Sequence, residues 1–144
     1  MKMKNKKFDE RQLWIRGNIF QHMVIVFVIL LFLNAFLSSY DIIWADGFHS
    51  SIIIILAAVA VGSVEMIFRE VYFTNSIQQI FLIILIAGCA LFTLILNILH
   101  TMDGEKIISD GTLTDTGGFL IMSVLMLNIG LSGLIKMITG LFKK

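Results

Sequence analysis

The chain has 144 residues, of which 58% are hydrophobic and 15% are charged, and its mean hydropathy is +0.92. Soluble domains carry about 45–50% apolar and about 25% charged residues, so the composition excludes an ordinary soluble domain and predicts an integral membrane protein. One cysteine excludes an intrachain disulfide and paired-cysteine motifs, and the absence of proline excludes proline-kinked helices.

Residues 1–18 form a basic, polar segment ahead of the first apolar stretch. Asp9 with Gln12 matches a capping box, and Glu10 follows in the first turn, where the helix dipole favours an anion. The pattern predicts a helix that starts near Asp9 and continues into a first membrane span at 19–37. A signal peptide fits less well, because the lead-in is long and acidic and no small-residue cleavage site follows.

Three further apolar stretches have the length of a bilayer-crossing helix, which takes about 20 residues. A loop rich in aromatic and acidic residues at 38–50 precedes the second span, and a tight turn at 69–76 precedes the third. The sequence therefore predicts an all-α bundle of four transmembrane helices in a membrane domain at 19–144. The predicted spans are 19–37, 51–68, 77–99 and 118–138.

The loop at 101–117 contains two Asp-Gly pairs, Asp103–Gly104 and Asp110–Gly111. Asp-Gly is a strong turn signal, so we expect a short hairpin or an irregular loop here. Either Asp115 or Thr116 is then positioned to cap the last span.

Lysine and arginine gather on one side of the predicted membrane. The N-terminal segment holds six, the 69–76 turn one and the C-terminal end three, whereas the two other loops share only Lys106. Because positive residues favour the cytoplasmic side, this bias predicts a multi-pass protein of the cell membrane with both termini cytoplasmic. The outer loops then carry the acidic residues Asp41, Asp46, Asp103, Glu105, Asp110 and Asp115.

Two stretches of the sequence are alike. LFLNAFLSSYD at 31–41 resembles LILNILHTMD at 94–103, and each places an asparagine before an outer-loop aspartate. Two tandem helical hairpins, related by an axis along the membrane normal, would give this pattern. Leucine-rich spans also match by chance, so a bundle without internal duplication stays open as the alternative.

Glu65 is the ionisable residue that lies inside a predicted span, away from its ends. It lies four residues, or about 6 Å of helix, before Arg69, so it is one turn from the predicted cytoplasmic boundary. One interpretation is a carboxylate that couples a proton or cation to transport. The other is a structural pair with Arg69, which this depth favours because a charge costs less near the membrane edge than at the centre.

Small residues predict where helices approach closely. Ala58 and Gly62 lie on the same helix stripe as Glu65 and form a small-xxx-small pattern. Gly130 and Gly133 in the fourth span are expected to act as packing notches in the same way.

Polar residues also recur inside the spans, namely Asn34, Thr93, Asn97 and Asn128. One interpretation is a polar lining for a substrate path. The alternative, which we favour, is hydrogen bonding between helices, worth on average ~0.6 kcal/mol per bond.

Patterns for metal, cofactor or catalytic chemistry are missing. His49, His100 and the outer acids have no HxxxH or HExxH spacing, so neither a metal nor a cofactor is predicted. The sequence has no phosphate-binding loop and no nucleophile–base motif, so we do not expect an enzyme. The short basic segment has no domain around it, which argues against nucleic-acid binding.

The strings FDERQLWIRG (8–17), LFLNAFL (31–37), IIWAD (42–46) and EMIFREVYF (65–73) resemble an uncharacterised family of small Gram-positive multi-pass membrane proteins with an N-terminal D-E-R-Q signature. The resemblance covers about the first half of the chain. It implies a membrane location and no enzyme activity. Members often pair with small helix-turn-helix regulators, which implies a regulatory or accessory role. The most specific positions are Asp9, Glu10, Arg11, Gln12 and Arg16.

The leading hypothesis is a non-enzymatic membrane protein that acts through a membrane-protein partner or as a homo-oligomer. The helix extension at 9–18 would make the contact, through Asp9, Glu10, Arg11, Gln12 and Arg16. A small oligomeric transporter or channel that uses Glu65 is the first alternative. An immunity protein against a membrane-active peptide, acting through the acidic outer loops, is the second.

Overall fold

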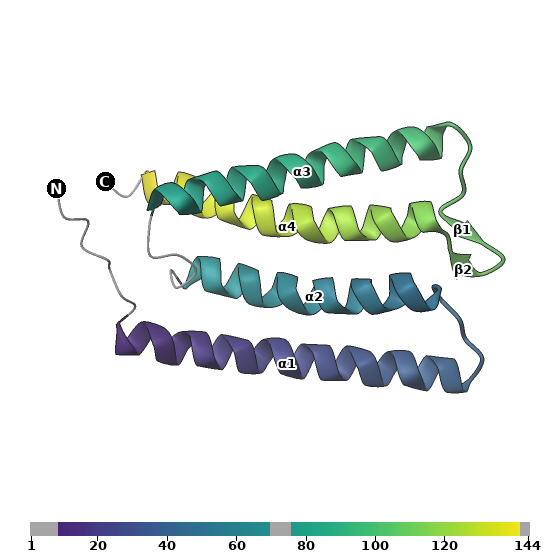
Figure 1. Ribbon diagram of the computed structural model, residues 1–144, viewed down its shortest axis with the longest axis horizontal. Helices are drawn as coiled ribbons and strands as arrows, with labels where there is room; N and C mark the ends of the chain where they lie inside the picture. The colour runs from purple at the N-terminus through teal and green to yellow at the C-terminus, as the bar shows by residue number, and fades with distance from the viewer. Residues whose placement is uncertain (1–8, 70–75, 142–144) are drawn as a thin grey trace.

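The computed structural model describes residues 9–69 and 76–141. Each of its four long helices is long and apolar enough to cross a membrane, so the predicted all-α, four-helix architecture is confirmed (Figure 1). A two-stranded antiparallel hairpin joins the last two helices. The elements in chain order are α1 (Glu10–Ser39), α2 (Gly47–Phe68), α3 (Ser76–Met102), β1 (Ile108–Ser109), β2 (Thr112–Leu113) and α4 (Asp115–Leu141).

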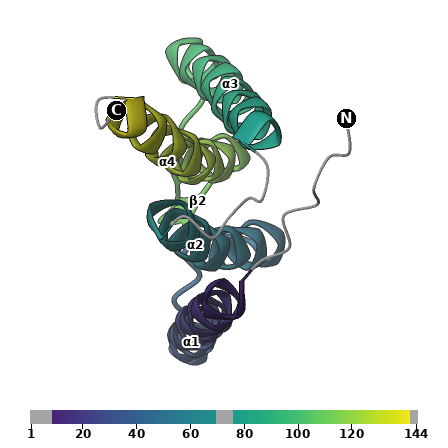
Figure 2. The same cartoon turned by 90° about the vertical axis from the view of Figure 1, so that its left-hand side faces the viewer.

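The helices pack in a row. The extensive contacts are those of α1 with α2, α2 with α4, and α4 with α3. Seen from the end, the order is therefore α1, α2, α4, α3, with α1 and α3 at the two edges (Figure 2). The pairs α1–α2 and α3–α4 each form a helical hairpin, as tandem hairpins would require, while an internal duplication stays a prediction. Along the helix axes, the start of α1 and the end of α4 lie at the same end of the bundle (Figure 1).

The helix starts are set by short polar side chains. The predicted capping box is present at α1, where the Asp9 carboxylate accepts from the backbone and Gln12 Oε1 accepts from the Asp9 N–H at 3.2 Å. At α2 the helix begins at Gly47, earlier than the predicted span, because Asp46 Oδ1 accepts from the His49 N–H at 2.6 Å. Each described helix contains its predicted span.

The cap predicted for the fourth helix is wrong. Asp115 and Thr116 both lie inside α4, and the residue before them makes the capping contact. Thr114 Oγ1 accepts from the Gly117 N–H at 3.2 Å, and its carbonyl accepts from the Gly118 N–H at 2.8 Å. Three consecutive residues here have side chains that can cap, so the residue types alone did not select the right one.

The loop between α3 and α4 forms a short hairpin, the first of the two predicted alternatives. Asp110 and Gly111 have φ values of 51° and 81°, the left-handed backbone that an Asp-Gly turn between two strands requires. The Leu113 N–H then donates to the carbonyl of Trp44 at 2.8 Å, and Ala45 forms a bridge with Leu113. The loop before α2 and the hairpin before α4 are therefore joined at one end of the bundle.

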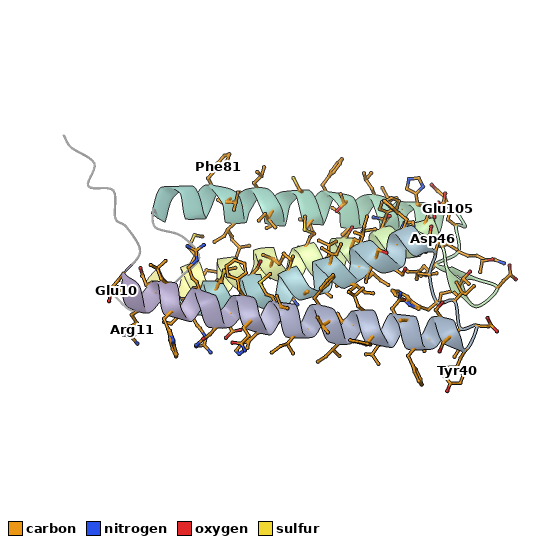
Figure 3. The ribbon with its side chains drawn as sticks, turned by 60° about the horizontal axis from the view of Figure 1, so that its bottom comes forward. Glu10, Arg11, Tyr40, Asp46, Phe81 and Glu105 are labelled. Atoms are coloured by element: carbon orange, nitrogen blue, oxygen red, sulfur yellow. The ribbon has the colours of Figure 1, made fainter. Side chains whose placement is uncertain are left out.

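Burial is greatest in α2, one of the two helices that have a neighbour on each side. In the most apolar 18-residue stretch of α2, 44% of the residues are buried, against 6% for α1. Only Ile19 is buried in α1, where it packs with Met66 of α2. Ile15 and Met23 pack against this pair, whereas many other large apolar side chains of α1 are exposed, as expected for a surface in contact with lipid; the side chains are drawn in Figure 3.

Candidate functional site

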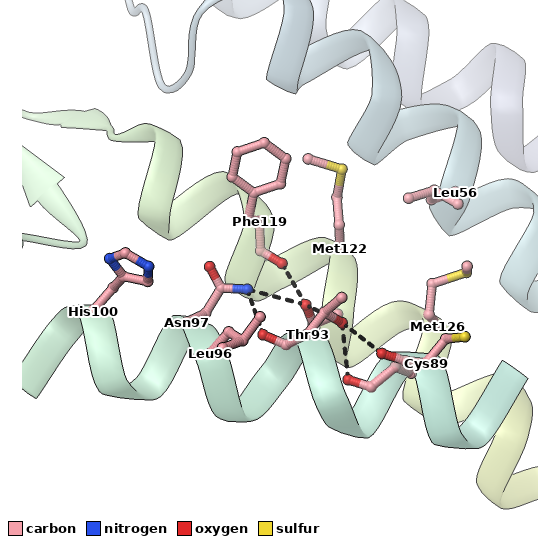
Figure 4. Close-up of a pocket in the computed structure, with 11 residues that line it drawn as sticks. Leu56, Cys89, Thr93, Leu96, Asn97, His100, Phe119, Met122 and Met126 are labelled. Carbon is pink, nitrogen blue, oxygen red and sulfur yellow. Dashed lines mark hydrogen bonds between the residues drawn. The ribbon is translucent and has the colours of Figure 1, made fainter.

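A cavity of about 420 Å³ lies between α2, α3 and α4. Most of its wall is apolar, and two of the polar residues predicted inside the spans, Thr93 and Asn97, are part of it (Figure 4). Cys89, Thr93 and His100 are exposed, so the cavity is open at the protein surface. The lining residues are Leu56, Cys89, Ala90, Thr93, Leu96, Asn97, His100, Phe119, Met122, Ser123 and Met126.

A hydrogen-bond network connects α3 and α4 beside this cavity. Asn97 Nδ2 donates to the Thr93 carbonyl at 2.8 Å and to Ser123 Oγ at 3.4 Å. Ser123 Oγ in turn lies 3.1 Å from Thr93 Oγ1 and 2.8 Å from the Phe119 carbonyl. Sequence reasoning missed Ser123, because no feature of the fourth span marks the turn that faces Thr93. The network is the interhelical bonding that we favoured for these polar residues.

The other two polar residues lie elsewhere. Asn34 Oδ1 on α1 accepts from the Trp44 indole N–H at 2.7 Å, which fastens the loop at the end of α1. Asn128 is exposed on α4, where its Oδ1 accepts from Ser132 Oγ at 3.5 Å. The common polar lining, which was the interpretation we did not favour, is therefore not formed: Asn34 and Asn128 are not part of the cavity wall, and α2 and α4 separate α1 from α3 in the row.

Glu65 lies at the opposite end of the bundle and has both carboxylate oxygens engaged. The predicted pair with Arg69 is present, with Arg69 Nη2 at 2.8 Å from Glu65 Oε1. Glu65 Oε2 lies 3.0 Å from His22 Nδ1 on α1, a partner that sequence reasoning missed. The Glu65 side chain keeps 21% of its surface exposed. Such a fully partnered carboxylate ties α1 to α2 and fits the structural interpretation of this residue.

A cluster of Asp46, His49 and Asp115 joins α2 to α4 beside the hairpin. His49 Nδ1 lies 2.9 Å from Asp46 Oδ1 and 3.7 Å from Asp115 Oδ1, and the three ligand atoms are within 4.8 Å of one another. The His49 side chain is 5% exposed. The His49 backbone N–H is the main cause that lowers the pKa of Asp46 below its usual 3.8.

This cluster has the right residue types for a metal but the wrong surroundings. A histidine that binds a metal through one ring nitrogen normally donates its other N–H to an acceptor. His49 Nε2 is buried and has no hydrogen-bond partner among the described residues. Metal binding at Nδ1 would place a proton on Nε2 and leave a buried donor unsatisfied, at a cost of about 1–3 kcal/mol. Nδ1 lies at hydrogen-bond distance from Asp46, 2.9 Å, so we describe the contact as a hydrogen-bonded tie between α2 and α4.

The five N-terminal residues that were predicted to contact a partner divide into two groups. The side chains of Asp9 and Gln12 form the capping box at the start of α1, and Arg16 is half-buried. Glu10 and Arg11 are exposed at the tip of the helix and point outward (Figure 3). Glu10 and Arg11 are therefore the two that remain best placed for a contact with another molecule.

Comparison with known proteins adds no functional assignment. No family model matches the chain, and no curated protein or solved structure is significantly similar to it. The resemblance to the D-E-R-Q family stays a prediction. The four apolar helices identify a multi-pass integral membrane protein.

Proposed function

We propose that this protein is a non-enzymatic accessory or regulatory subunit of the cell membrane, which acts by binding another membrane protein or a second copy of itself through α1. The observation that carries the proposal is the position of α1 at the edge of the row, with Ile19 as its one buried residue. In this proposal both termini are cytoplasmic.

The polar tip of α1 supports a protein contact beyond simple lipid contact. Lipid can cover the apolar part of α1, since lipid tails are as apolar as leucine side chains. The helix, however, begins at Glu10, nine residues or about 13 Å before the predicted span at 19. Glu10 and Arg11 are thus held on a regular helix beyond the apolar span, where a partner can pair with their charges.

The arrangement of the polar residues supports this function over transport. A transport path would need polar groups from several helices to face one channel. Asn34 is fastened to Trp44 at 2.7 Å, on the far side of α2 from Thr93 and Asn97. Glu65 is held by Arg69 and His22, which suits an anchor better than a carboxylate that must bind and release a proton.

Capture of partners in mild detergent tests the proposal. The variant reverses both exposed charges, Glu10→Lys with Arg11→Glu, and the matched control reverses two charges of the opposite loop, Asp103→Lys with Lys106→Glu. We expect the N-terminal variant to lose at least about tenfold of the co-purified partner or of the self-associated form, since charge reversal across a contact costs over 1.4 kcal/mol. Equal capture by wild type and both variants would remove the proposal.

Cysteine labelling tests the orientation independently. In a Cys89→Ser background, Lys106→Cys in the hairpin loop and Arg11→Cys at the tip of α1 are exposed to a membrane-impermeant maleimide. We expect intact cells to label position 106 and to label position 11 only after permeabilisation, as the positive-inside bias requires. The reverse order of labelling contradicts the orientation.

A further inference from the structure

We propose that the cavity between α2, α3 and α4 binds a single-chain amphiphile whose polar end donates a hydrogen bond, namely a long-chain alcohol. The inference is independent of the contact assigned to α1. It rests on the hydrogen bonds that Thr93, Asn97 and Ser123 already make and on the position of the one acceptor that these three side chains leave unused.

The donors of the network are all occupied. Asn97 Nδ2 uses its two N–H groups on the Thr93 carbonyl and Ser123 Oγ, at 2.8 and 3.4 Å. The Thr93 hydroxyl donates to the carbonyls of Ala90 and Cys89 at 3.0 and 3.1 Å. The single Ser123 hydroxyl proton is shared between the Phe119 carbonyl and Thr93 Oγ1. A ligand therefore finds no unused donor among these three side chains.

One strong acceptor is left without a partner. Asn97 Oδ1 receives no hydrogen bond from the residues that the structure describes, while the nitrogen of the same carboxamide is turned to Thr93 and Ser123 (Figure 4). Asn97 lies two residues before the outer end of the predicted span at 99, so its free carbonyl oxygen is at the level where the polar end of a lipid lies. A ligand hydroxyl would supply the missing donor, whereas a carboxylate or an ether would not.

The polarity of the cavity matches an amphiphile lying along the helices. Its polar end is at Asn97 and His100, toward the end of the bundle that carries the hairpin. Its other end is formed by Cys89, Leu56 and Met126, toward the middle of the spans. Cys89 and Asn97 are eight residues apart, or about 12 Å of helix. A lipid in the same leaflet has this orientation, with its polar end outward and its chain toward the midplane.

The volume of the cavity favours a ligand with a single aliphatic chain. Sites for small molecules measure about 300–1,000 Å³, and this one, at about 420 Å³, lies near the lower limit. Methionines at 122 and 126 are flexible enough to adjust to an aliphatic chain.

A second groove serves as an internal control. It is formed by Ile29, Phe32, Leu33, Ala35 and Phe36 on α1 and has a similar volume of about 490 Å³, but its lining contains no polar side chain. Any acyl chain can cover this groove equally well, so it should not distinguish an alcohol from its ether.

Photolabelling of the full-length protein in lipid nanodiscs tests the proposal. The probe is tetradecan-1-ol with a diazirine near the methyl end, and mass spectrometry locates the labelled residues. We expect saturable labelling of the cavity segments 86–97 and 119–126. Unlabelled tetradecan-1-ol should compete at about fivefold lower concentration than its methyl ether, because one neutral hydrogen bond contributes about 1 kcal/mol. On the α1 groove the two competitors should be equal.

Two variants assign the effect to Asn97. Asn97→Leu removes the acceptor and should make alcohol and ether equal competitors in the cavity. Asn128→Leu, at the exposed asparagine outside the cavity, should retain the fivefold difference. The proposal is overturned if tetradecan-1-ol and its methyl ether compete equally in the wild-type protein, or if labelling is spread evenly over α1. Neither result requires a variant to fold. A difference that persists in Asn97→Leu overturns the assignment to this side chain.

Discussion

The α3–α4 hairpin and the α1–α2 hairpin bring their helices together by different means. In α3–α4, backbone lies against backbone, since a Cβ added to Gly130 would be 2.7 Å from the Cα of Ala87. In α1–α2, a Cβ added to Gly62 would meet the flexible end of the Met23 side chain at 2.1 Å. The first contact has no room to adjust, whereas the second can change by rotation of one side chain.

The α3–α4 hairpin adds the hydrogen bonds of Ser123 with Thr93 and Asn97 to this close packing, whereas the α1–α2 hairpin has polar contacts without backbone-to-backbone packing at Gly62. His22 on α1 and Glu65, near the end of α2, pair at 3.0 Å, and Trp44 donates to Asn34 at 2.7 Å near the end of α1. Association of helices in lipid depends on close packing and hydrogen bonds, because lipid is as apolar as the side chains. The helices α3 and α4 are therefore the closely packed pair, while α1 is held through side chains that can adopt other conformations, as the proposed contact through α1 would require.

The largest expected effect is that of Gly130→Ala. The new methyl group must push the backbone of α3 away, which costs about 1–3 kcal/mol of unfolding free energy. Gly88→Ala on α3 is the matched control, since nothing lies within 4 Å of its added Cβ. We expect Gly88→Ala to be neutral or stabilising by up to about 1 kcal/mol, because alanine is the better helix former. Denaturant unfolding in bicelles measures both, and equal destabilisation would refute the close contact at Gly130.

Gly62→Ala is expected to cost less, about 1 kcal/mol. Its methyl group would overlap with Cγ and Sδ of Met23, and this flexible side chain can adopt another rotamer. In a Met23→Ala background the same substitution should have little further effect, because the overlapping atoms are gone. If Gly62→Ala were as damaging as Gly130→Ala, the contrast between the two hairpins would disappear.

The elements of this fold could be predicted because their signals are local. Apolar stretches of span length, the Asp9 capping box and the Asp110–Gly111 turn each depend on residues close in the chain. The Glu65–Arg69 pair also follows from spacing along a single helix. Two helix starts were not predicted correctly: the cap of α2 at Asp46, which lies within the predicted loop, and the cap of α4, where three successive residues can each cap the helix.

The neighbours of each helix could not be predicted in the same way. Helices that are apolar all round have no single face that marks the side of a partner. The contacts of His22 with Glu65 and of Ser123 with Thr93 depend on the order of the helices in the row. The separation of Asn34 from Thr93 has the same cause. The hydrogen-bonded site was therefore half predicted, on α3, while its partner on α4 was missed.

A double-mutant cycle measures how strongly the polar contact holds α1. The variants are His22→Gln, Glu65→Gln and the pair, and unfolding free energies are measured at pH 7. We expect a coupling of about 0.6 kcal/mol, typical of hydrogen bonds between membrane helices. The partly exposed positions of both side chains keep the value small. A coupling above about 2 kcal/mol would mean that α1 is fastened as firmly as α3, against the proposed difference.

The smallest expected effect is an acid-induced loosening at the hairpin end, where the two helical hairpins are joined. The His49 backbone N–H lowers the pKa of Asp46 below 3.8, and the Thr116 hydroxyl lowers the pKa of Glu105 below 4.5. For a carboxyl whose pKa is lowered by folding, the stabilisation is complete above the ordinary value. The stabilisation is lost as the pH falls below the ordinary pKa and then through the lower pKa of the folded protein.

Fluorescence of Trp44 reports this change, because its carbonyl accepts from the Leu113 N–H at the junction. In a Trp14→Phe background we expect the emission to shift as the pH falls from 5 to 3. Asp46→Asn retains a capping residue but removes the charge, so with Glu105→Gln it should abolish most of the shift. Asp103→Asn, at an exposed position of the same loop, should leave the shift intact. A shift that survives the double variant would place the acid-sensitive contact elsewhere, and the hairpin end would then not be the pH-dependent link between the two helical hairpins.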